Sequence, residues 1–369
     1  MKKPVSLLLC CALLCLSVPV FAEAAVPSVT GKVIEIEKYG HARLDITVEA
    51  FTAAGFELGD IVTVKAGTYE GDMPYFNGYY VDSGEYMVRA YAGHENIAVC
   101  INYGRFAETA GIGVGDEVTI TMKIKAGALA EQTLNTLEYT NERADYESDE
   151  IFANFRMVTA GGIGEGKLYR SCSPVNGQNE RRTIANALAE AAGVKSVMNM
   201  ANSDEELSGH PSGEGFHSPY YMDLVQKGHV IALAMPIDYT SDEFAEGIVK
   251  GLTFLAGEET PYLVHCTDGR NRTGFAAMIL EALMGASEVE IAADYLISFE
   301  NYYHLDPVAD AEKLSMIAEK NVKEMLRAVA GLEKGADLAG TDLAAAAESY
   351  LTAHGMEAEA LETLKEKLR

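Results

Sequence analysis

Basic residues are scarce in this 369-residue chain, where 29 lysines and arginines stand against 55 acidic residues and give a formal net charge of −26. A protein that binds nucleic acid needs a basic face, so this balance argues against nucleic acid as a partner. It also argues against docking on anionic lipid through overall charge. An anionic substrate would be repelled at long range, so any phosphate-binding site must be locally positive.

Cysteine is scarce as well, with six in the chain, of which Cys10, Cys11 and Cys15 lie in an apolar run near the start. Three remain further on: Cys100, Cys172 and Cys266. In an exported protein an odd number leaves at least one thiol free, which argues against a disulfide framework.

Long hydrophobic runs are absent beyond the first residues. Residues 1–24 have the features of an export signal, because two lysines precede the apolar run Leu7–Val20 and small residues suited to cleavage surround Ala22 and Ala24. The run is too short for a comfortable membrane span, although an uncleaved anchor is the alternative. We predict an exported protein, either released or held at the cell envelope, with no stable membrane span.

The length allows about two domains. Residues 26–127 have a strand-like pattern, and Asn77-Gly78 between two aromatic-rich runs predicts a hairpin. A phrase of glycine, aspartate and a β-branched run occurs at 59–64 and again at 115–120, where Gly-Asp supplies the turn and the rest a strand. We predict a small all-β barrel or sandwich here.

The same segment resembles the C-terminal β-domain of the SAM-dependent hydroxide adenosyltransferases, over Gly31–Ala42 and Asn102–Ile120. The active site of that family also uses a preceding domain, which has no counterpart in this sequence. The resemblance therefore implies the fold and no activity, and we expect an accessory module whose ligand, if it has one, is unknown.

Residues 128–150 are polar and predict a linker or an exposed helix. From residue 151 to 369 the pattern changes to strands alternating with helices and then to a helical tail. This order predicts an α/β domain with a central sheet flanked by helices. The predicted strands are 194–200, 230–236 and 262–265, and the predicted helices include 244–255 and 274–284, the latter closed by Gly285.

The most informative stretch is residues 264–274, Val-His-Cys-Thr-Asp-Gly-Arg-Asn-Arg-Thr-Gly, between a predicted strand and a predicted helix. Five residues separate Cys266 from Arg272, and Thr273 follows. A tight loop entering a helix points successive backbone N–H groups into one concave nest, and the helix N-terminus adds partial positive charge. The predicted phosphate-binding residues of this nest are Thr267, Asp268, Gly269, Arg270 and Asn271.

This loop predicts catalysis through a cysteine. Gly269 permits unusual backbone conformations, and Arg272 can fork onto two phosphate oxygens. The same positive field favours the thiolate of Cys266, which would attack phosphorus and form a phosphocysteine. The Thr273 hydroxyl can donate to the departing sulfur, and no metal or other cofactor is required because the loop supplies the positive charge.

The alternative is that Cys266 is a buried apolar cysteine and Arg272 a surface residue. A Cys-x5-Arg spacing alone occurs often by chance, but His-Cys-x-x-Gly-x-x-Arg-Thr-Gly between a strand and a helix is far more specific. His265 is expected to order the loop and not to carry protons.

The loop is the signature of the protein tyrosine phosphatase superfamily, and about residues 154–369 resemble its bacterial tyrosine-phosphatase branch, whose members also act on phosphoinositides. Further matching motifs are Asn154-Phe155-Arg156 with Gly161-Gly162, Lys167-Leu168-Tyr169-Arg170-Ser171, Asp294-Tyr295-Leu296-Ile297-Ser298, and Tyr350-Leu351 with Gly355.

The sequence departs from that branch in two places. The branch often has Lys-Asp before the loop arginine, with the aspartate as a general-acid candidate, whereas this chain has Arg270 and Asn271. Asn271 cannot usefully donate a proton. The Asp-Leu-Arg that follows the branch's second strand is also absent, and residues 199–201, Asn-Met-Ala, stand in that region.

A leaving alkoxide or phenoxide still benefits from an acid. Asp238 follows a predicted strand 28 residues before Cys266, a loop position where dual-specificity phosphatases commonly place their acid. The alternative is a turn or capping aspartate, although Asp242 is the better candidate to cap the next helix. Asp268 is the second acid candidate, but we expect it to point outward because a carboxylate facing phosphate opposes binding.

The predicted function is phosphomonoester hydrolysis, with a phosphorylated protein, an inositol phospholipid or an inositol phosphate as substrate. Arg270 supplies a second cation that suits substrates with additional phosphates, unless it is an ordinary solvated arginine. Cys172 is either a redox partner of Cys266 or a core cysteine. The alternative function is a pseudophosphatase that binds a phosphorylated ligand without turning it over.

Overall fold

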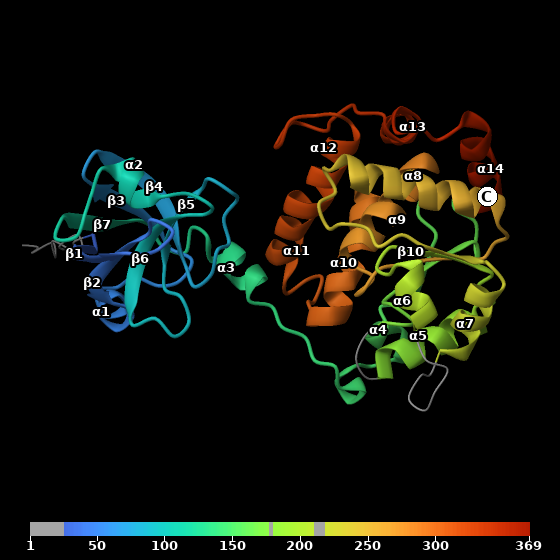
Figure 1. The fold of residues 1–369 in the computed structure, drawn as a ribbon, viewed down its shortest axis with the longest axis horizontal. Helices are drawn as coiled ribbons and strands as arrows, with labels where there is room; N and C mark the ends of the chain where they lie inside the picture. Colours follow the sequence, from blue (N-terminus) through green and yellow to red (C-terminus); the bar gives the residue numbers. More distant parts are fainter. Residues whose placement is uncertain (1–25, 177–179, 210–217) are drawn as a thin grey trace, which may run out of the picture. The chain divides into compact units, whose positions relative to one another are not determined.

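The computed structural model describes residues 26–176, 180–209 and 218–369 (Figure 1). The predicted export signal, residues 1–24, lies outside these residues. The chain divides into two compact units, Met1–Gln132 and Thr133–Arg369, and each is treated by itself. Within the described ranges, no helix is long and apolar enough to cross a membrane.

The first unit is a closed seven-stranded barrel in the order β1-β2-β6-β5-β4-β3-β7. Alternate side chains of its strands fill the interior, where Val62, Val64, Val99 and Ile120 are fully buried. The strands are β1 (Ser28–Ile36), β2 (Ala42–Thr47), β3 (Ile61–Ala66), β4 (Tyr69–Phe76), β5 (Tyr86–Arg89), β6 (Asn96–Ile101) and β7 (Glu117–Ile124). Short helices α1 (Val48–Ala53) and α2 (Phe106–Ala110) interrupt them, and α3 (Leu129–Asn135) follows.

The repeated Gly-Asp phrase has the predicted role. Gly59 and Gly115 have φ values of 91° and 95°, which favour glycine, and each phrase leads into a strand. The two strands, β3 and β7, pair antiparallel, with Val64 opposite Ile120. The two similar sequences therefore form neighbouring strands of one barrel.

The predicted hairpin at Asn77-Gly78 is wrong. β4 ends at Phe76 and pairs in parallel with β5, so no strand folds back directly after the two residues. A two-residue hairpin of this sequence needs positive φ at both positions, and neither residue has it. Asn77 instead exchanges hydrogen bonds with Gln132, at 3.3 Å from its backbone and 2.8 Å to its side chain.

The second unit contains a five-stranded sheet in the order β11-β10-β12-β9-β8, in which only β8 runs antiparallel to its neighbour. The strands are β8 (Arg156–Val158), β9 (Leu168–Ser171), β10 (Ser196–Asn199), β11 (Val230–Ala232) and β12 (Tyr262–His265). The helices before β12 are α4 (Asp149–Phe152), α5 (Glu180–Ala191), α6 (Asp204–Gly209), α7 (Pro219–Gln226) and α8 (Asp242–Gly257), with a 3-10 turn at Arg143–Asp145.

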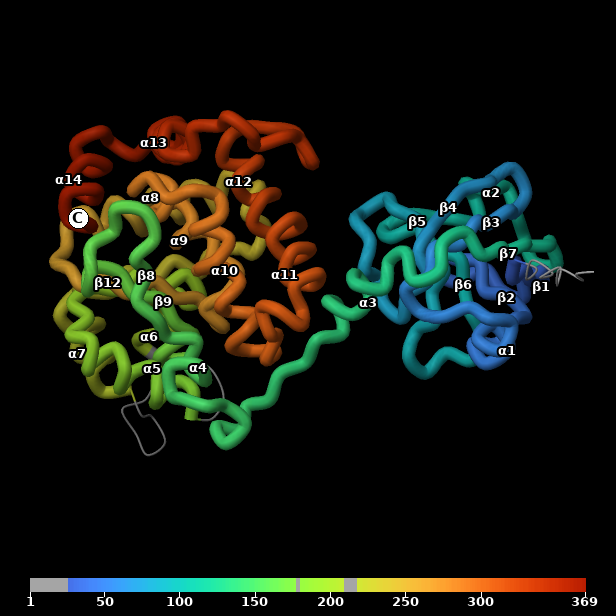
Figure 2. Tube along the Cα trace, turned by 180° about the vertical axis from the view of Figure 1, so that it is seen from behind, coloured from blue at the N-terminus to red at the C-terminus, as the bar shows by residue number. Residues whose placement is uncertain are grey.

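The helical tail of this unit begins after the loop that follows β12. It consists of α9 (Asn271–Leu283), α10 (Glu288–Tyr303), α11 (Ala311–Ile317), a π-helical segment (Ala318–Lys323), α12 (Glu324–Val329), α13 (Leu343–Ala353) and α14 (Ala358–Leu368). α14 packs on α8, and α13 packs on α9 (Figure 2). Gly285 closes α9 with φ 82°, as predicted.

The sheet separates two hydrophobic cores because successive strand residues face opposite sides. Met198 and Val264 belong to the core under α8 and α9, whereas Val197 and Leu263 belong to the core under α5 and α7. The predicted class is confirmed: a small β-barrel is followed along the chain by an α/β domain with a flanked sheet and a helical tail.

One capping prediction is wrong. α8 begins with Ser241 as its N-cap, whose hydroxyl accepts a hydrogen bond from the backbone N–H of Phe244. Asp242 is the first helical residue and adds negative charge near the positive helix end. Ser241 has the β-region backbone conformation of an N-cap, whereas Asp242 already lies within the helix.

Candidate active site

The predicted strand–loop–helix arrangement is present at the centre of the sheet. β12 is the central strand, and its carboxyl end leads through residues 266–270 into α9, which begins at Asn271 and not at the expected Gly274. Ligands of open parallel sheets bind beyond the carboxyl ends of the strands. Cys266 is the first residue of this loop and is 3% exposed.

Buried side chains hold the backbone carbonyls of the loop from one side. The carbonyl oxygen of Asp268 accepts a hydrogen bond from the Tyr302 hydroxyl at 2.9 Å and one from Asn154 Nδ2 at 3.2 Å. The carbonyl oxygen of Gly269 accepts from Arg170 Nη2 at 3.0 Å and also from Asn154 Nδ2 at 3.2 Å. Three buried donors therefore fix the direction of two successive peptide groups.

This arrangement turns the N–H groups of the loop to the other side. A trans peptide points its N–H opposite to its carbonyl, so the N–H groups of Gly269 and Arg270 face away from those donors. Gly269 has φ 68°, and a Cβ there would lie 2.1 Å from the carbonyl oxygen of Ser171, so no larger residue fits. Holding the outside of the loop in this way therefore turns two successive N–H groups, those of Gly269 and Arg270, toward its other side.

A buried ion network supports these donors. The carboxylate of Asp294 in α10 pairs with Arg156 Nε at 2.8 Å and with Arg170 Nη1, and Arg170 is fully buried. Burial alone would raise the pKa of Asp294, but the two arginines outweigh it and lower the pKa. Burial and the Asp294 carboxylate raise the pKa of neighbouring Glu281 well above its ordinary value, which favours its protonated form.

Arg272 lies over the loop. Its Nη1 donates to the carbonyl oxygens of Met200, at 2.7 Å, and Met235, at 2.9 Å, and its Nη2 donates to the Thr267 hydroxyl at 3.3 Å. Arg272 and Thr267 are five residues apart, so this contact closes the loop. The guanidinium keeps further N–H groups for a ligand because it has five.

Thr273 is fully buried in the first turn of α9. Its hydroxyl oxygen has no hydrogen-bond partner within the described part of the chain. A buried polar atom without a partner is uncommon and often marks a functional site.

Arg270 does not have the solvated position that was its alternative. Its Nη1 donates to the Tyr303 hydroxyl, and its guanidinium lies 5.3 Å from the ring centre of Phe299. The second cation of the loop is therefore held against α10.

The two acid candidates differ in their surroundings. Asp238 is exposed, and its Oδ1 accepts hydrogen bonds from the backbone N–H of Thr240 at 3.0 Å and from the Thr240 hydroxyl at 2.6 Å. The contact with that hydroxyl, followed by that with the N–H, lowers the pKa of Asp238. Asp268 lines a cavity of about 310 Å³ together with Thr267, Arg181 and Tyr302.

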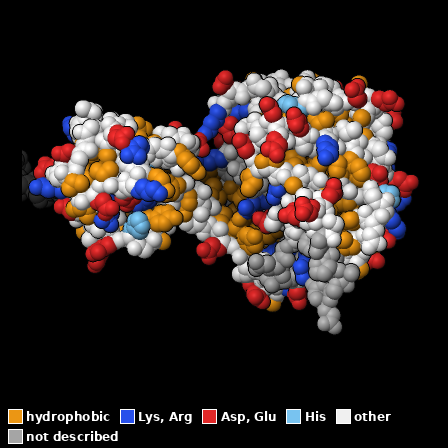
Figure 3. Space-filling model, viewed as in Figure 1, with side chains coloured by type: hydrophobic (Ala, Val, Ile, Leu, Met, Phe, Trp, Pro, Cys, Tyr) orange, Lys and Arg blue, Asp and Glu red, His pale blue; other side chains and the backbone are white. Residues whose placement is uncertain are grey.

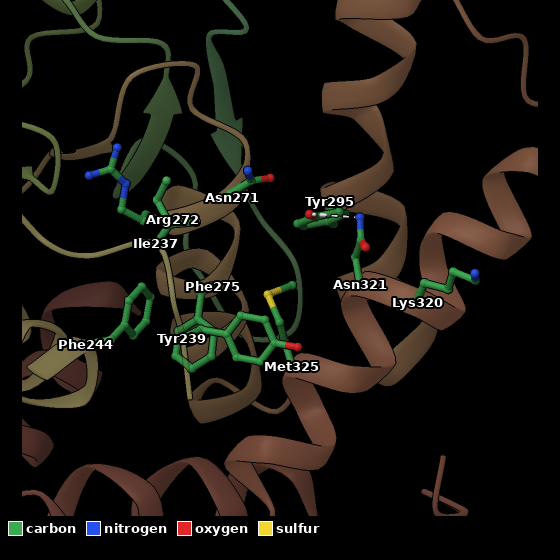
Figure 4. Close-up of a pocket in the computed structure, with 10 residues that line it drawn as sticks. All are labelled: Ile237, Tyr239, Phe244, Asn271, Arg272, Phe275, Tyr295, Lys320, Asn321 and Met325. Carbon is green, nitrogen blue, oxygen red and sulfur yellow. Dashed lines mark hydrogen bonds between the residues drawn. The ribbon is translucent and has the colours of Figure 1, made fainter. Parts of the chain in front are cut away.

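A second cavity, of about 230 Å³, lies beside Arg272 (Figure 4). Its walls include the rings of Tyr239 and Phe275, and the guanidinium of Arg272 points away from these two rings. Lys320, from the π-helical segment, also lines the cavity.

On the outer surface of this unit, hydrophobic side chains lie among charged ones (Figure 3).

The remaining thiols are unpaired. Cys100, Cys172 and Cys266 are all free, and burial raises the pKa of Cys172 to about 12. Cys172 is therefore neutral and inert at physiological pH. Among the described residues, no group of three or more His, Cys, Asp and Glu side chains is placed to hold a metal ion.

His265 orders the loop. Its Nδ1 lies 3.1 Å from the carbonyl oxygen of Cys266, which can only accept, so Nδ1 carries the proton. Its Nε2 then accepts from the Tyr221 hydroxyl at 2.9 Å, and that hydroxyl accepts from Asn199 Nδ2 at 3.0 Å. Burial lowers the pKa of His265 to about 4, so the imidazole is neutral in the folded protein at pH 7.

We expect this histidine to make the protein less stable in acid. Unfolding restores the ordinary pKa of 6.5, so the unfolded chain binds one more proton than the folded chain between about pH 6.5 and 4. The free energy of unfolding should fall by about 3 kcal/mol across this window as pH decreases. Urea titrations of the wild type and of His265→Gln at several pH values measure this slope.

The exposed His304 provides the control for that measurement. His304→Gln should keep the wild-type slope of unfolding free energy against pH. In His265→Gln this slope should decrease by the amount that corresponds to the uptake of about one proton on unfolding. An unchanged slope in His265→Gln would show that another group causes the acid sensitivity.

The comparison with protein families agrees with this geometry. A model of the tyrosine phosphatase family matches residues 152–369, more than half of the chain. The chain therefore belongs to the tyrosine phosphatase family, and the prediction that it is a phosphatase, a hydrolase of phosphate esters, is confirmed.

Among solved structures, the chain resembles several at low sequence identity. The core catalytic domain of the PP-IP phosphatase Siw14 from S. cerevisiae, solved in complex with citrate, is 18% identical over 47% of this chain and 90% of its own, with a TM-score of 0.27. Another Siw14 catalytic core is 18% identical over 46% and 92%, also with a TM-score of 0.27.

An uncharacterized conserved protein from Thermotoga maritima is 23% identical over 26% of this chain, with a TM-score of 0.24. The match spans only 36% of that protein's length. No match was found among curated proteins.

The sequence did not reveal every residue that shapes the site. Tyr302 and Arg181 come from α10 and α5, far from the loop in sequence, and no spacing signal connects them to it. Asn154, Arg170 and Asp294 were noted only as parts of matching motifs, and their shared position behind the loop becomes visible in three dimensions.

Proposed function

We propose that the second unit hydrolyses phosphomonoesters through a phosphocysteine on Cys266. The observation that carries the proposal is the direction of the loop's peptide groups, whose carbonyls are held by Asn154, Arg170 and Tyr302 so that their N–H groups face the opposite side. Amides aligned at a helix N-terminus bind a phosphate dianion and stabilise the charge that develops on it.

The proposed reaction has two displacements at phosphorus. The thiolate of Cys266 attacks, an S–P bond forms, and the P–O ester bond breaks as the leaving oxygen takes a proton from Asp238. Water then attacks the phosphocysteine and gives a proton to Asp238, and the S–P bond breaks to release inorganic phosphate. Arg272 binds two phosphate oxygens throughout, and the buried Thr273 hydroxyl donates a hydrogen bond to the departing sulfur.

The proposed substrates are phosphotyrosine in a protein, an inositol phospholipid or an inositol phosphate. The cavity walls beside Arg272 suit an aromatic or lipid portion, and Arg270 adds positive charge for a further phosphate. We also propose that the protein works outside the cytoplasm, on the basis of residues 1–24.

A substrate panel tests this proposal against the alternative of a binding module. The wild-type chain is assayed with p-nitrophenyl phosphate, a phosphotyrosine peptide, a phosphatidylinositol phosphate in vesicles and inositol hexakisphosphate. Release of inorganic phosphate above the buffer rate from any of them supports an enzyme. Tight binding of these probes without release would establish the pseudophosphatase instead.

The role of Asp238 makes a prediction that depends on the leaving group. In the present conformation only Oδ1 of its carboxylate accepts from Thr240, so the proton that the acid donates would be carried on Oδ2. Asp238→Asn should slow hydrolysis of an alkyl phosphate by about 10²-fold or more but slow p-nitrophenyl phosphate little, because p-nitrophenolate leaves without an acid. Since the pKa of Asp238 is lowered, alkyl phosphate turnover should also rise toward acidic pH.

Asp268→Asn is the matched comparison for that assay. If Asp238→Asn retains the full rate on the alkyl phosphate, the assignment of Asp238 fails. If Asp268→Asn alone shows the dependence on the leaving group, the loop aspartate is the acid.

A further inference from the structure

The β-barrel unit contains a large cavity to which the phosphatase chemistry gives no role. It has a volume of about 700 Å³, and its walls include Tyr39, His41, Tyr79 and Tyr103. All its lining residues belong to the first unit, so the cavity does not depend on the second. Its volume lies in the range of small-molecule sites.

Tyrosine rings are unusually exposed around this cavity. Tyr103 is 92% exposed, and Tyr39 and Tyr79 are exposed as well. Tyr91, also exposed, adds its ring to that of Tyr79 at a centroid distance of 6.2 Å. Tyr103 has φ 53°, a conformation that costs free energy in a residue with a side chain. Several exposed aromatic rings in one place indicate a binding surface.

The buried side chain of Arg89 contacts two of these rings, those of Tyr79 and Tyr91. Arg89 is 5% exposed, donates to the Tyr79 hydroxyl at 2.6 Å, and places its guanidinium 5.6 Å and 5.4 Å from the ring centres of Tyr79 and Tyr91. Glu37 pairs with it at 2.9 Å. Burying an ion pair costs free energy, and here the pair orients side chains that the solvent reaches. The rings are therefore pre-oriented for a ligand.

The charges around the cavity are largely compensated. Arg89 is paired with Glu37, and Arg105 is paired with Glu108. His41 is buried, and burial followed by the charge of Arg89 lowers its pKa, so it is neutral at pH 7. Lys38 lies over the outer ring, that of Tyr39, at 5.1 Å. Such surroundings do not favour a phosphate or another strongly charged ligand.

The ring geometry narrows the class of ligand. The planes of Tyr39 and His41 are inclined by 51°, those of His41 and Tyr79 by 44°, and those of Tyr79 and Tyr91 by 52°. No two of these neighbouring rings are parallel, so they do not form a slot for a flat base. A puckered sugar ring needs only one aromatic face for its C–H groups, with tyrosine hydroxyls and buried donors beside it for its own hydroxyls.

We propose that this tyrosine cluster of the β-barrel unit is a binding site for a neutral carbohydrate. Tyr103 and Tyr39 are exposed and are the rings proposed to stack on the sugar. Tyr79 is held by Arg89 and, at 3.0 Å, by His41 Nε2. The inference does not rest on the activity of the second unit. It gives the accessory module the task of holding the protein near polysaccharide.

Titration calorimetry on the full chain tests the proposal. The probes are cellohexaose, xylohexaose and chitohexaose, with adenosine and inorganic phosphate as counter-probes. We expect at least one oligosaccharide to bind, Tyr103→Ala or Tyr39→Ala to weaken it by about tenfold, and Tyr103→Phe to retain it because the ring remains. Ile124→Ala, an exposed apolar position on β7 outside the cavity, should leave binding unchanged.

Three outcomes of these titrations would contradict a carbohydrate site. The proposal is overturned if none of the three oligosaccharides binds, if Tyr103→Ala and Tyr39→Ala bind as the wild type does, or if Tyr103→Phe loses binding as fully as Tyr103→Ala. Adenosine binding that disappears in Tyr103→Ala while the sugars stay silent would show a nucleoside site. Thermal unfolding of each variant confirms that the barrel is intact before its binding is compared.

Discussion

Cys266→Ser is expected to lower turnover of p-nitrophenyl phosphate by about 10⁴-fold or more, the scale of loss seen when an enzyme loses its nucleophile. A serine hydroxyl at this position stays protonated near neutral pH, so it cannot attack phosphorus as a thiolate does. The loop backbone and Arg272 should remain in place, since their contacts do not involve the sulfur. The variant should therefore still bind a phosphotyrosine peptide.

Cys172→Ser is the matched control for that experiment. Cys172 lines the cavity next to Thr267, but its buried thiol is neutral. Its replacement should leave kcat within about threefold of the wild type. If Cys172→Ser loses turnover while Cys266→Ser keeps it, the nucleophile is Cys172 and the assignment of Cys266 is wrong.

Asp294→Asn is expected to reduce the free energy of unfolding by about 3–5 kcal/mol. The substitution removes the carboxylate that pairs with Arg156 and with the fully buried Arg170. Removing one partner of a buried ion pair costs far more than removing an exposed one. Urea unfolding at pH 7 measures the loss, and Glu259→Gln, which breaks the exposed pair with Lys195, should cost less than about 1 kcal/mol.

Glu281→Gln provides a sharper contrast within the same network. Glu281 is buried beside Asp294, and its pKa is raised well above the ordinary value, which favours the protonated form. Glutamine resembles the protonated acid in shape and charge, so this variant should lose no more than about 1 kcal/mol. Equal losses in Asp294→Asn and Glu281→Gln would mean that the two carboxyl groups share the negative charge.

The loop and its setting could be predicted from the sequence because their information is local. The order of strand, Cys266, Gly269, Arg272 and helix lies within one short stretch, and the spacing itself imposes the geometry. The apolar runs of β12 and α9 likewise predict a buried strand and a buried helix. The helix boundary was misplaced by three residues because Asn271, Arg272 and Thr273 are polar residues whose helical conformation depends on the loop.

What the sequence could not give is the pairing of distant segments. Asn77-Gly78 has the composition of a tight turn, but Gln132, 55 residues away, holds Asn77 in another conformation. The donors that contact the loop carbonyls come from three separate segments of the chain, so only the fold brings Asn154, Arg170 and Tyr302 together. The same limit applies to the tyrosine cluster, whose members come from four different loops.

The central claim is that phosphate is transferred to the sulfur of Cys266. Wild-type protein mixed with excess p-nitrophenyl phosphate and quenched within milliseconds should carry the added mass of one phosphoryl group, and peptide mapping should place it on the peptide containing Cys266. The same treatment should leave Cys266→Ser unmodified. The account would be contradicted if the wild-type protein turns over p-nitrophenyl phosphate but carries the phosphoryl group on another residue, or carries none at any quench time.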